Sequence, residues 1–204
     1  MEGNSEFTNI KLIIIGASGV GKTALIHKLT GNEDIFPTVG LEYTPFQVKM
    51  NNEKTICFQI WDMSGNEKYK DITTPLLKRP DFCLLVLDLS SRKSFEELDR
   101  WYNLLKENSE GNFTSYLLGN KADLEREISE EEINEWARPR NIEYFETSAI
   151  WKKNKSEEFQ LGIEPIFQKI GQNCPKNNTY NGLPLKIIRP LKTLHPRKHN
   201  CFCC

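Results

Sequence analysis

Gly16-Ala17-Ser18-Gly19-Val20-Gly21-Lys22-Thr23 is the stretch that decides the fold of this chain. It has the spacing G-x-x-x-x-G-K-[ST], follows an apolar run at 11–15 and precedes a helical pattern at 24–29. In that context the backbone N–H groups wrap a diphosphate, the lysine reaches the terminal phosphates and the last hydroxyl ligates magnesium. We therefore predict nucleoside triphosphate contacts from Ser18, Gly19, Val20, Gly21, Lys22 and Thr23. The loop alone does not say which base is bound.

Around this loop, apolar β-rich runs alternate with helical patterns. The predicted strands are 10–15, 42–50, 54–61, 82–88, 113–119 and 142–146, and the predicted helices are 24–29, 91–108, 129–138 and 156–170. The second and third strands form a hairpin across Asn51-Asn52-Glu53. Within 91–108 a stripe of core residues recurs at helical spacing: Phe95, Leu98, Tyr102 and Leu105. The alternation predicts an α/β fold with a six-stranded, mostly parallel sheet and helices on both faces, and the loop at 16–23 indicates a fold of the P-loop NTPase type.

Charge divides the chain into an acidic body and a basic tail. The 204 residues carry a net charge of −1, yet residues 171–204 hold six Lys or Arg and no acid. We expect a flexible N-terminus at 1–8, one domain at 9–170 and a disordered basic tail at 171–204 that meets an anionic partner. Three of the six cysteines fall in the last four positions, so no spaced disulfide framework exists and a reducing compartment is expected. No apolar stretch is long enough to span a bilayer.

Three further motifs follow predicted strands, at the sheet edge where open α/β folds bind ligands. After the third strand, the Asp62 carboxylate can hold the magnesium shell through water, and the N–H of Gly65 can meet the γ-phosphate. In Asn120-Lys121-Ala122-Asp123, the Asp123 carboxylate can accept hydrogen bonds from guanine N1–H and its 2-amino group, while the Lys121 stem packs along the ring and Asn120 ties the loops together. In Glu146-Thr147-Ser148-Ala149, backbone N–H groups of Ser148 and Ala149 can donate to guanine O6.

Together these motifs resemble the Ras superfamily of small GTPases, and most closely its Rab family. The resemblance rests on 16–23, Thr38-Val39-Gly40, 58–62, 120–123, 146–149 and the terminal Cys203-Cys204. It covers about residues 9–170, a small G domain, plus the extreme C-terminus. It implies a membrane-tethered switch of vesicle trafficking that binds GTP or GDP with Mg²⁺ and hydrolyses GTP. It also implies that Thr38 ligates the metal with Thr23 and Asp62, and that Lys22, Thr38 and Asn66 act in catalysis.

The chain departs from the family pattern at three places. Asn66 occupies the position of a glutamine that orients the attacking water, and its stem is one methylene shorter, so we expect slow intrinsic hydrolysis. The 15 residues from Thr23 to Thr38 are a shorter spacing than is usual, so the base is expected to be more exposed and the nucleotide to leave faster. The second switch, at 64–80, lacks the usual aromatic pair at 76–80, and Met63-Ser64 resembles some Arf-like proteins.

The family resemblance gives the tail a role. Cys203 and Cys204 resemble the Rab double-cysteine end that receives prenyl groups, although residues 201–204 also parse as a C-a-a-X box. One lipid with the tail's basic residues, or two lipids, anchors firmly. The resemblance implies an exchange factor, an activating protein, effectors and a prenyl-binding chaperone, at the cytoplasmic face of intracellular membranes in exchange with the cytosol.

Other functions remain open on the sequence alone. Asn66 and the short first switch are compatible with a nucleotide-binding scaffold of negligible turnover, and an Arf-like or Ras-like switch in another pathway is a further alternative. A P-loop nucleotide kinase would need a lid with phosphate-binding arginines, which the sequence does not reveal. A nucleic-acid polymer is not expected as a partner, because no aromatic residues are interleaved among the tail's basic ones.

Overall fold

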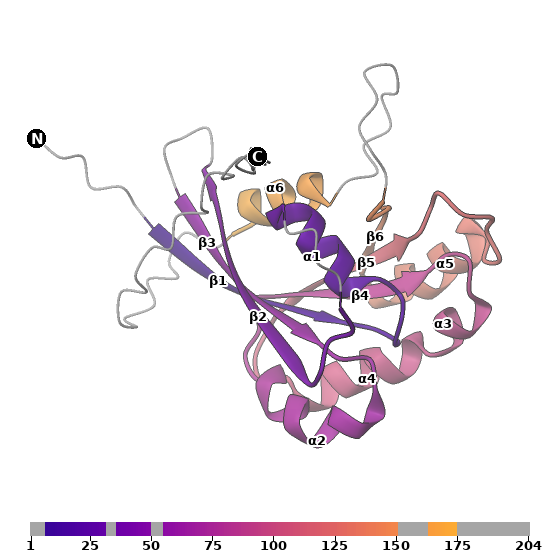
Figure 1. The fold of residues 1–204 in the computed structure, drawn as a ribbon, viewed down its shortest axis with the longest axis horizontal. Coiled ribbons are helices and arrows are strands. Elements are labelled where there is room, and N and C mark those ends of the chain that lie inside the picture. The colour runs from indigo at the N-terminus through magenta and orange to yellow at the C-terminus, as the bar shows by residue number, and fades with distance from the viewer. Residues whose placement is uncertain (1–6, 32–35, 50–54, 151–162, 175–204) are drawn as a thin grey trace, which may run out of the picture.

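The computed structural model describes residues 7–31, 36–49, 55–150 and 163–174 (Figure 1). Its sheet has the order β2-β3-β1-β4-β5-β6, and only β2 runs antiparallel to its neighbour. The strands are β1 (Phe7–Ile15), β2 (Leu41–Lys49), β3 (Thr55–Met63), β4 (Phe82–Asp88), β5 (Thr114–Asn120) and β6 (Glu143–Glu146). All six predicted strands and the mostly parallel sheet are confirmed. The predicted turn at 51–53 lies outside the described residues.

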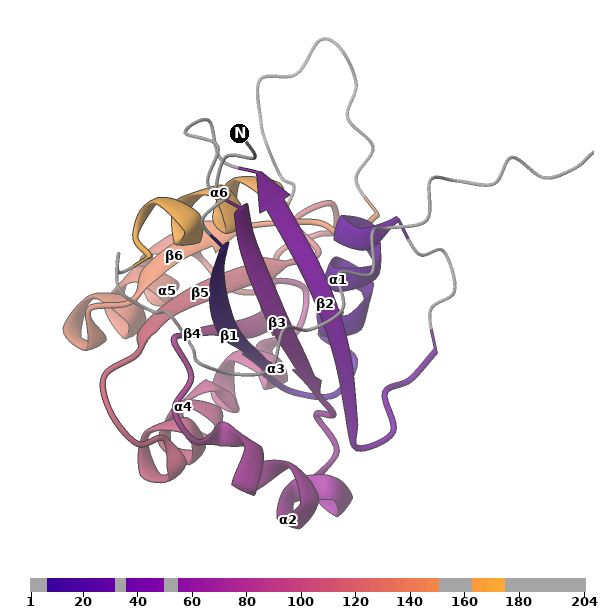
Figure 2. The same cartoon turned by 90° about the vertical axis from the view of Figure 1, so that its left-hand side faces the viewer.

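Helices cover both faces of the sheet, as predicted (Figures 1 and 2). On one face α1 (Lys22–Thr30) and α6 (Glu164–Gln172) pack Leu25, Ile26, Ile166 and Phe167 against inward side chains of β1, β3 and β4. On the other face lie α3 (Arg92–Glu96), α4 (Leu98–Asn108) and α5 (Glu130–Ala137). β4 is buried along its whole length, as its continuous apolar run predicts. Each face therefore has a separate hydrophobic core.

The predicted helix at 91–108 is two helices that meet at Glu97. The predicted stripe still packs into the core, with Leu98 and Leu105 buried and Phe95 and Tyr102 partly buried against the same cluster. α5 begins with a capping box, in which the Ser129 hydroxyl accepts from the Glu132 backbone N–H and the Glu132 carboxylate accepts from the Ser129 N–H.

The second switch contains helical turns that the sequence did not predict. A 3₁₀ helix at Glu67–Tyr69 leads into α2 (Lys70–Thr73), and a second 3₁₀ helix spans Thr74–Leu77. These elements are short, and their residues are mostly polar and exposed, so they carry no helical periodicity to detect. Leu77 alone is fully buried and joins the core beneath α4.

The ends of the domain also differ from expectation. Phe7 and Thr8, expected in the flexible N-terminus, begin β1 and pair with Thr55 and Ile56 of β3. α6 begins at Glu164, with Pro165 in its first turn where a missing N–H costs nothing, and it continues to Gln172 beyond the expected boundary at 170. Residues 151–162 and the tail from 175 lie outside the described residues. No helix in the described ranges is long and apolar enough to cross a membrane.

Candidate nucleotide-binding site

The phosphate loop lies between β1 and α1, as its motif requires. Lys22, the first residue of α1, is buried, and its ammonium donates to the carbonyl oxygens of Gly16 and Ala17 at 2.8 and 2.7 Å. Burial lowers the pKa of Lys22 to about 8, and the nearby Asp62 carboxylate opposes this shift. The lysine is thus folded back over its own loop, with its charge held at the N-terminus of α1.

Two glycines permit close contacts that define the loop. Gly21 has φ +94°, and a Cβ there would lie 2.3 Å from the Asn120 side-chain nitrogen. Gly65, on the second switch, approaches the loop so closely that a Cβ would lie 2.3 Å from the Ser18 backbone nitrogen. The phosphate loop therefore packs closely against Asn120 at the end of β5 and against Gly65 of the second switch.

Oxygen ligands converge beside Lys22. The hydroxyls of Thr23 and Thr38 lie 2.6 Å apart, Thr38 donates to Asp62 Oδ2 at 3.2 Å, and Thr23 donates to the same oxygen. We expected Asp62 to follow the end of the third strand. It lies within β3 instead, because β3 continues two residues beyond the predicted end. It is 1% exposed, and burial raises the pKa of its carboxyl while hydrogen bonds from Thr23 and Thr38 and the charge of Lys22 counteract the shift.

This donor set fits a hard divalent cation. Two hydroxyls and one carboxylate supply the oxygen ligands that Mg²⁺ prefers, and Asp62 Oδ1 is buried with no hydrogen-bond partner among the residues that the structure describes. Mg²⁺ keeps several waters and is held by few protein groups plus substrate phosphates, which matches a site with one carboxylate. The residues present thus fit the metal that the motif implies.

At the other end of the site, the β5 and β6 loops are joined side by side. Asn120 Nδ2 donates to the Val20 carbonyl at 2.7 Å, across 100 residues of sequence. Asp123 is held by its carboxylate, which accepts from the Ser148 hydroxyl. The Ala122 N–H donates to the Thr147 carbonyl at 3.1 Å, and Ala149 follows, half-buried. The structure therefore brings Asn120, Asp123, Ser148 and Ala149 together with the phosphate loop.

Two residues that the sequence analysis did not single out, Arg126 and Tyr144, brace these loops through Glu146. Arg126 donates to both Glu146 carboxylate oxygens at 2.6 Å, and Tyr144 donates to Glu146 at 2.9 Å. Burial is the main cause that raises the pKa of Tyr144 above its ordinary range, followed by the charge of Glu146. The sequence does show a positive charge, Arg126, after the motif at 120–123 and a negative charge, Glu146, in the motif at 146–149. Nothing in one sequence shows that these two residues form a pair.

The second switch engages Asn66 in a local contact. Asn66 is exposed and extended, and its side-chain oxygen accepts from the Lys68 backbone N–H at 3.1 Å, which caps the 3₁₀ helix. Its own N–H donates to the Ser64 hydroxyl at 3.3 Å. The next residue, Glu67, forms an ion pair with Arg100 of α4. Asparagine is a favoured N-cap residue whereas glutamine is not, so the departure from the family pattern has a structural consequence.

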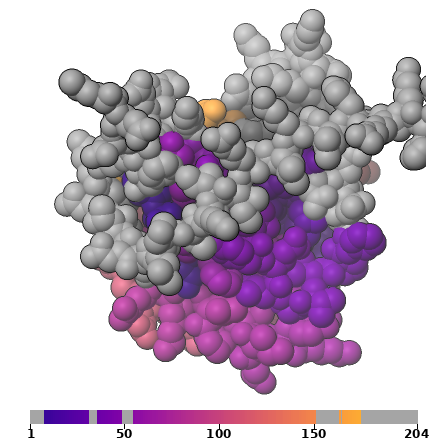
Figure 3. Space-filling model, turned by 60° about the vertical axis from the view of Figure 1, so that its left-hand side comes forward, coloured from indigo at the N-terminus to yellow at the C-terminus, as the bar shows by residue number. Residues whose placement is uncertain are grey.

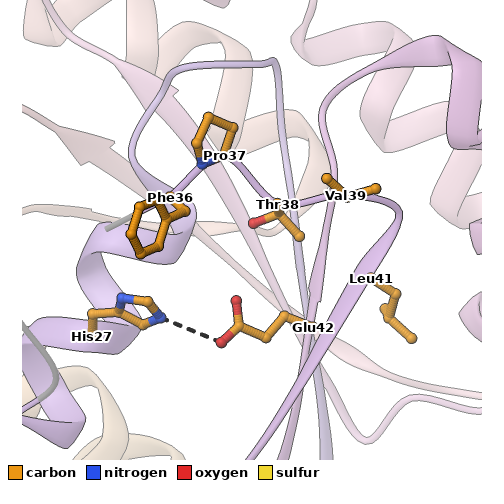
Figure 4. A pocket seen from close by; sticks show the side chains of 7 residues that line it. All are labelled: His27, Phe36, Pro37, Thr38, Val39, Leu41 and Glu42. Atoms are coloured by element: carbon orange, nitrogen blue, oxygen red, sulfur yellow. Dashed lines mark hydrogen bonds and ion pairs between the residues drawn. The ribbon is translucent and has the colours of Figure 1, made fainter. Parts of the chain in front are cut away.

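The first switch forms one wall of a cavity of about 310 Å³ (Figure 4). Figure 4 shows His27 of α1 facing Glu42 of β2 across its floor, with His27 Nε2 3.3 Å from Glu42 Oε1. Phe36 lies above them and is 73% exposed, while residues 32–35 are outside the described ranges. Thr38, two residues on, turns toward Thr23 and Asp62. The switch threonine is therefore placed by the site, whereas the preceding aromatic is not packed.

Comparison with known proteins agrees with this architecture. The model of the Ras family matches residues 11–168. Ras-related protein Rab-13 of Bos taurus is 37% identical over 173 residues, covering 82% of this chain and 85% of its own. GTP-binding protein ypt3 of Schizosaccharomyces pombe is 32% identical over 204 residues, covering 95% of each chain, and Ras-related protein Rab-11A of Dictyostelium discoideum is 35% identical over 202 residues, covering 95% of this chain and 94% of its own. The chain therefore belongs to the Ras family and, within it, to the Rab small GTPases, which bind GTP and GDP with Mg²⁺, hydrolyse GTP and act in vesicle trafficking.

Proposed function

We propose that this chain is a membrane-tethered Rab switch with slow intrinsic turnover, built on the site described above. The convergence of Thr23, Thr38 and Asp62 is the observation that carries the proposal. Thr38 belongs to the first switch and the other two to the fixed sheet and α1. Thr38 would hold the first switch against the core when a γ-phosphate and metal are bound, and the N–H of Gly65 would bring the second switch to the same point.

Each site residue has a proposed role. Lys22 neutralises charge on the β- and γ-phosphates, and Ser18, Gly19, Val20 and Gly21 supply backbone donors. Thr23, Thr38 and Asp62 would hold Mg²⁺, which would neutralise the negative charge of the phosphates. Asp123 reads guanine, supported by Ser148 and Ala149, while Lys121 packs along the ring and Asn120 fixes the two loops.

Asn66 is the proposed water-positioning residue, and its cap explains slow turnover. The side-chain oxygen bonded to Lys68 N–H holds the amide along the chain. To orient a water, the amide has to leave this hydrogen bond, and its short stem then reaches less far than a glutamine. The hydrogen bond and the shorter stem both displace the amide, and catalysis requires such a group to be positioned to well within an ångström.

Ordering of the two switches creates the proposed effector surface. Exposed apolar side chains flank the site: Val39 on the first switch, Tyr43 on β2 and Ile72 on the second switch. Tyr43 stacks obliquely on Trp61 of β3, with ring centroids 4.9 Å apart. In the space-filling view of Figure 3 the purple surface around β2 adjoins the magenta surface of the segment after β3. As a Rab-family member the chain works with regulators and effectors, and this face is where we place the effectors.

The tail supplies the proposed membrane anchor. Rab proteins act on intracellular membranes, and Cys203 and Cys204 are the proposed prenylation sites, supported by the tail's basic residues. An exchange factor, an activating protein and a prenyl-binding chaperone are proposed partners in a cycle between the cytoplasmic face of membranes and the cytosol. Mass spectrometry of the chain purified from its native cell tests this, and an unmodified Cys203 and Cys204 in the membrane fraction would refute it.

Product analysis separates the switch from a scaffold of negligible turnover. The protein is loaded with GTP and Mg²⁺, and bound GTP and GDP are quantified over hours. Slow but complete conversion to GDP, lost in Lys22→Ala and in EDTA, supports the switch. GTP that persists even after addition of cell extract from the native source supports the scaffold.

Membership of the Ras family removes the alternative of a P-loop nucleotide kinase.

A further inference from the structure

Asp88 lies at the carboxyl end of β4, next to the guanine-reading loop. It is the last residue of the strand and is in register with Asn120, the last residue of β5. Asp88 Oδ2 lies 2.6 Å from the Lys121 ammonium. The Asp88 side chain is 10% exposed and that of Lys121 is 33% exposed, so water screens this pair only in part.

The carboxylate of Asp88 is fixed from two sides. Its other oxygen, Oδ1, accepts from the Ser90 N–H at 2.9 Å and from the Ser90 hydroxyl at 2.7 Å. The strand end itself is anchored, because the Asp88 N–H donates to Ser94 Oγ at 3.0 Å and Ser94 Oγ donates back to the Asp88 carbonyl at 2.9 Å. Burial acts to raise the pKa of Asp88, but hydrogen bonds from Lys121 and Ser90 outweigh it and hold the pKa below its ordinary value.

Lys121 is held in an unusual conformation at the same place. Its φ of +61° is in the left-handed region, which is unfavourable for a residue that carries a side chain. The Leu124 N–H donates to its carbonyl at 2.9 Å, which closes a turn. With its backbone set by that turn and its ammonium pinned to Asp88, the methylene stem spans from the end of β5 to the end of β4.

We propose that Asp88 is a positioning residue for nucleotide binding, which stretches the Lys121 stem into a fixed wall for the purine ring. Ser90 supports Asp88 in this role, because its N–H and hydroxyl orient the Asp88 carboxylate. The inference rests on the proposed packing of Lys121 along the base. Asp88 acts through Lys121 on the face of the purine ring, and not on the hydrogen-bonding edge that Asp123 reads. It therefore affects the rate of nucleotide release without changing which base is preferred.

Release of a fluorescent GDP from the Mg²⁺-bound full chain tests this proposal. Asp88→Asn keeps the size of the side chain and removes its charge, and we expect GDP release to become about tenfold faster, equivalent to one charge-assisted hydrogen bond. Ser90→Ala gives a smaller increase, about threefold. Asp99→Asn is the control, because it weakens an ion pair of similar length, with Arg140 at 2.7 Å, although the Asp99 side chain is more exposed, at 60%. We expect it to leave GDP release unchanged.

A double-mutant cycle shows whether Asp88 acts through Lys121. Lys121→Ala alone accelerates release at least as much as Asp88→Asn, and the double variant releases GDP no faster than Lys121→Ala. The ratio of GDP to IDP affinity stays at the wild-type value in Asp88→Asn, since IDP differs only in the 2-amino group that Asp123 reads.

The outcomes that overturn the proposal are distinct from those that overturn the proposed function. If Asp88→Asn releases GDP at the wild-type rate, or if its effect adds in full to that of Lys121→Ala, then Asp88 does not position Lys121. If Lys121→Ala itself leaves release unchanged, the role proposed for Lys121 fails, and this inference fails with it. A melting temperature of a GDP-bound variant that falls further than its measured loss of GDP affinity explains would reveal a general loss of stability and refute a specific positioning role.

Discussion

The two ends of the nucleotide site are built differently. At the guanine end, the loops after β5 and β6 are bound to each other and to the phosphate loop by Asn120–Val20, Ser148–Asp123 and Arg126–Glu146 contacts. At the switch end, Phe36 is exposed and Asn66 bonds only within its own segment in the described part of the chain. With the roles proposed above, nucleotide recognition falls on loops that are bonded to one another, and nucleotide turnover on segments with fewer such contacts in the described part of the chain. The chain's departures from its family fall on the switch end.

The guanine end is where we expect the largest effect. Asp123→Asn replaces an acceptor that faces two guanine donors with an amide, so GDP affinity falls about a thousandfold, as expected when buried donors lose their partner. Xanthine carries a carbonyl oxygen in place of the 2-amino group, so the variant gains affinity for XDP. Competition binding measures both. Ser148→Ala, which removes only one hydrogen bond to Asp123, serves as the control and lowers GDP affinity about tenfold.

The phosphate loop, between the two ends, offers the next largest effect. Gly21→Ala forces a Cβ to within 2.3 Å of the Asn120 amide at φ +94°, so both the loop and its tie to β5 must shift. We expect GDP release about a hundredfold faster. Gly19→Ala is the matched variant, because its φ of +80° brings the same backbone strain, about 1–2 kcal/mol, and a Cβ there has no atom of the described residues within 4 Å. We expect about a tenfold increase there, and equal effects would show that the contact with Asn120 is unimportant.

The guanine end and the switch end each contain an arginine–glutamate ion pair, so the two ends can be compared directly. Arg126 and Glu146 have side chains 34% and 23% exposed, whereas Arg100 and Glu67 are 44% and 68% exposed. Arg126→Ala loosens the braced loops, and we expect GDP release about fivefold faster. Arg100→Ala breaks a more screened pair on the second switch, so the expected change is within about twofold. A larger effect from Arg100→Ala in stopped-flow release would reverse our ranking of the two ends.

Local patterns in the sequence were sufficient to predict the frame of this site. Strand periodicity and the four motifs gave the sheet, the phosphate loop and the residues at its edge, because each signal lies within a few neighbouring residues. The pairing of Asp88 with Lys121, of Arg126 with Glu146 and of Ser148 with Asp123 was not predicted, since each joins residues 20 or more apart.

The second switch was the least predictable region. Its turns contain few buried side chains, so no periodicity marks them, and the capping role of Asn66 depends on a 3₁₀ helix that the sequence did not suggest. The proposed water-positioning role of Asn66 came from the resemblance, whereas its hydrogen bond with the Lys68 N–H was seen only in the structure.

The most direct test of this account is the single-turnover rate of GTP hydrolysis in Asn66→Gln. A glutamine gives up the favoured cap and gains one methylene of reach, so we predict a rate about threefold above wild type. Asn66→Asp keeps the cap without the amide, and its rate stays at or below wild type. A rate in Asn66→Gln equal to wild type, with GTP fully bound, would contradict the claim that Asn66 limits turnover.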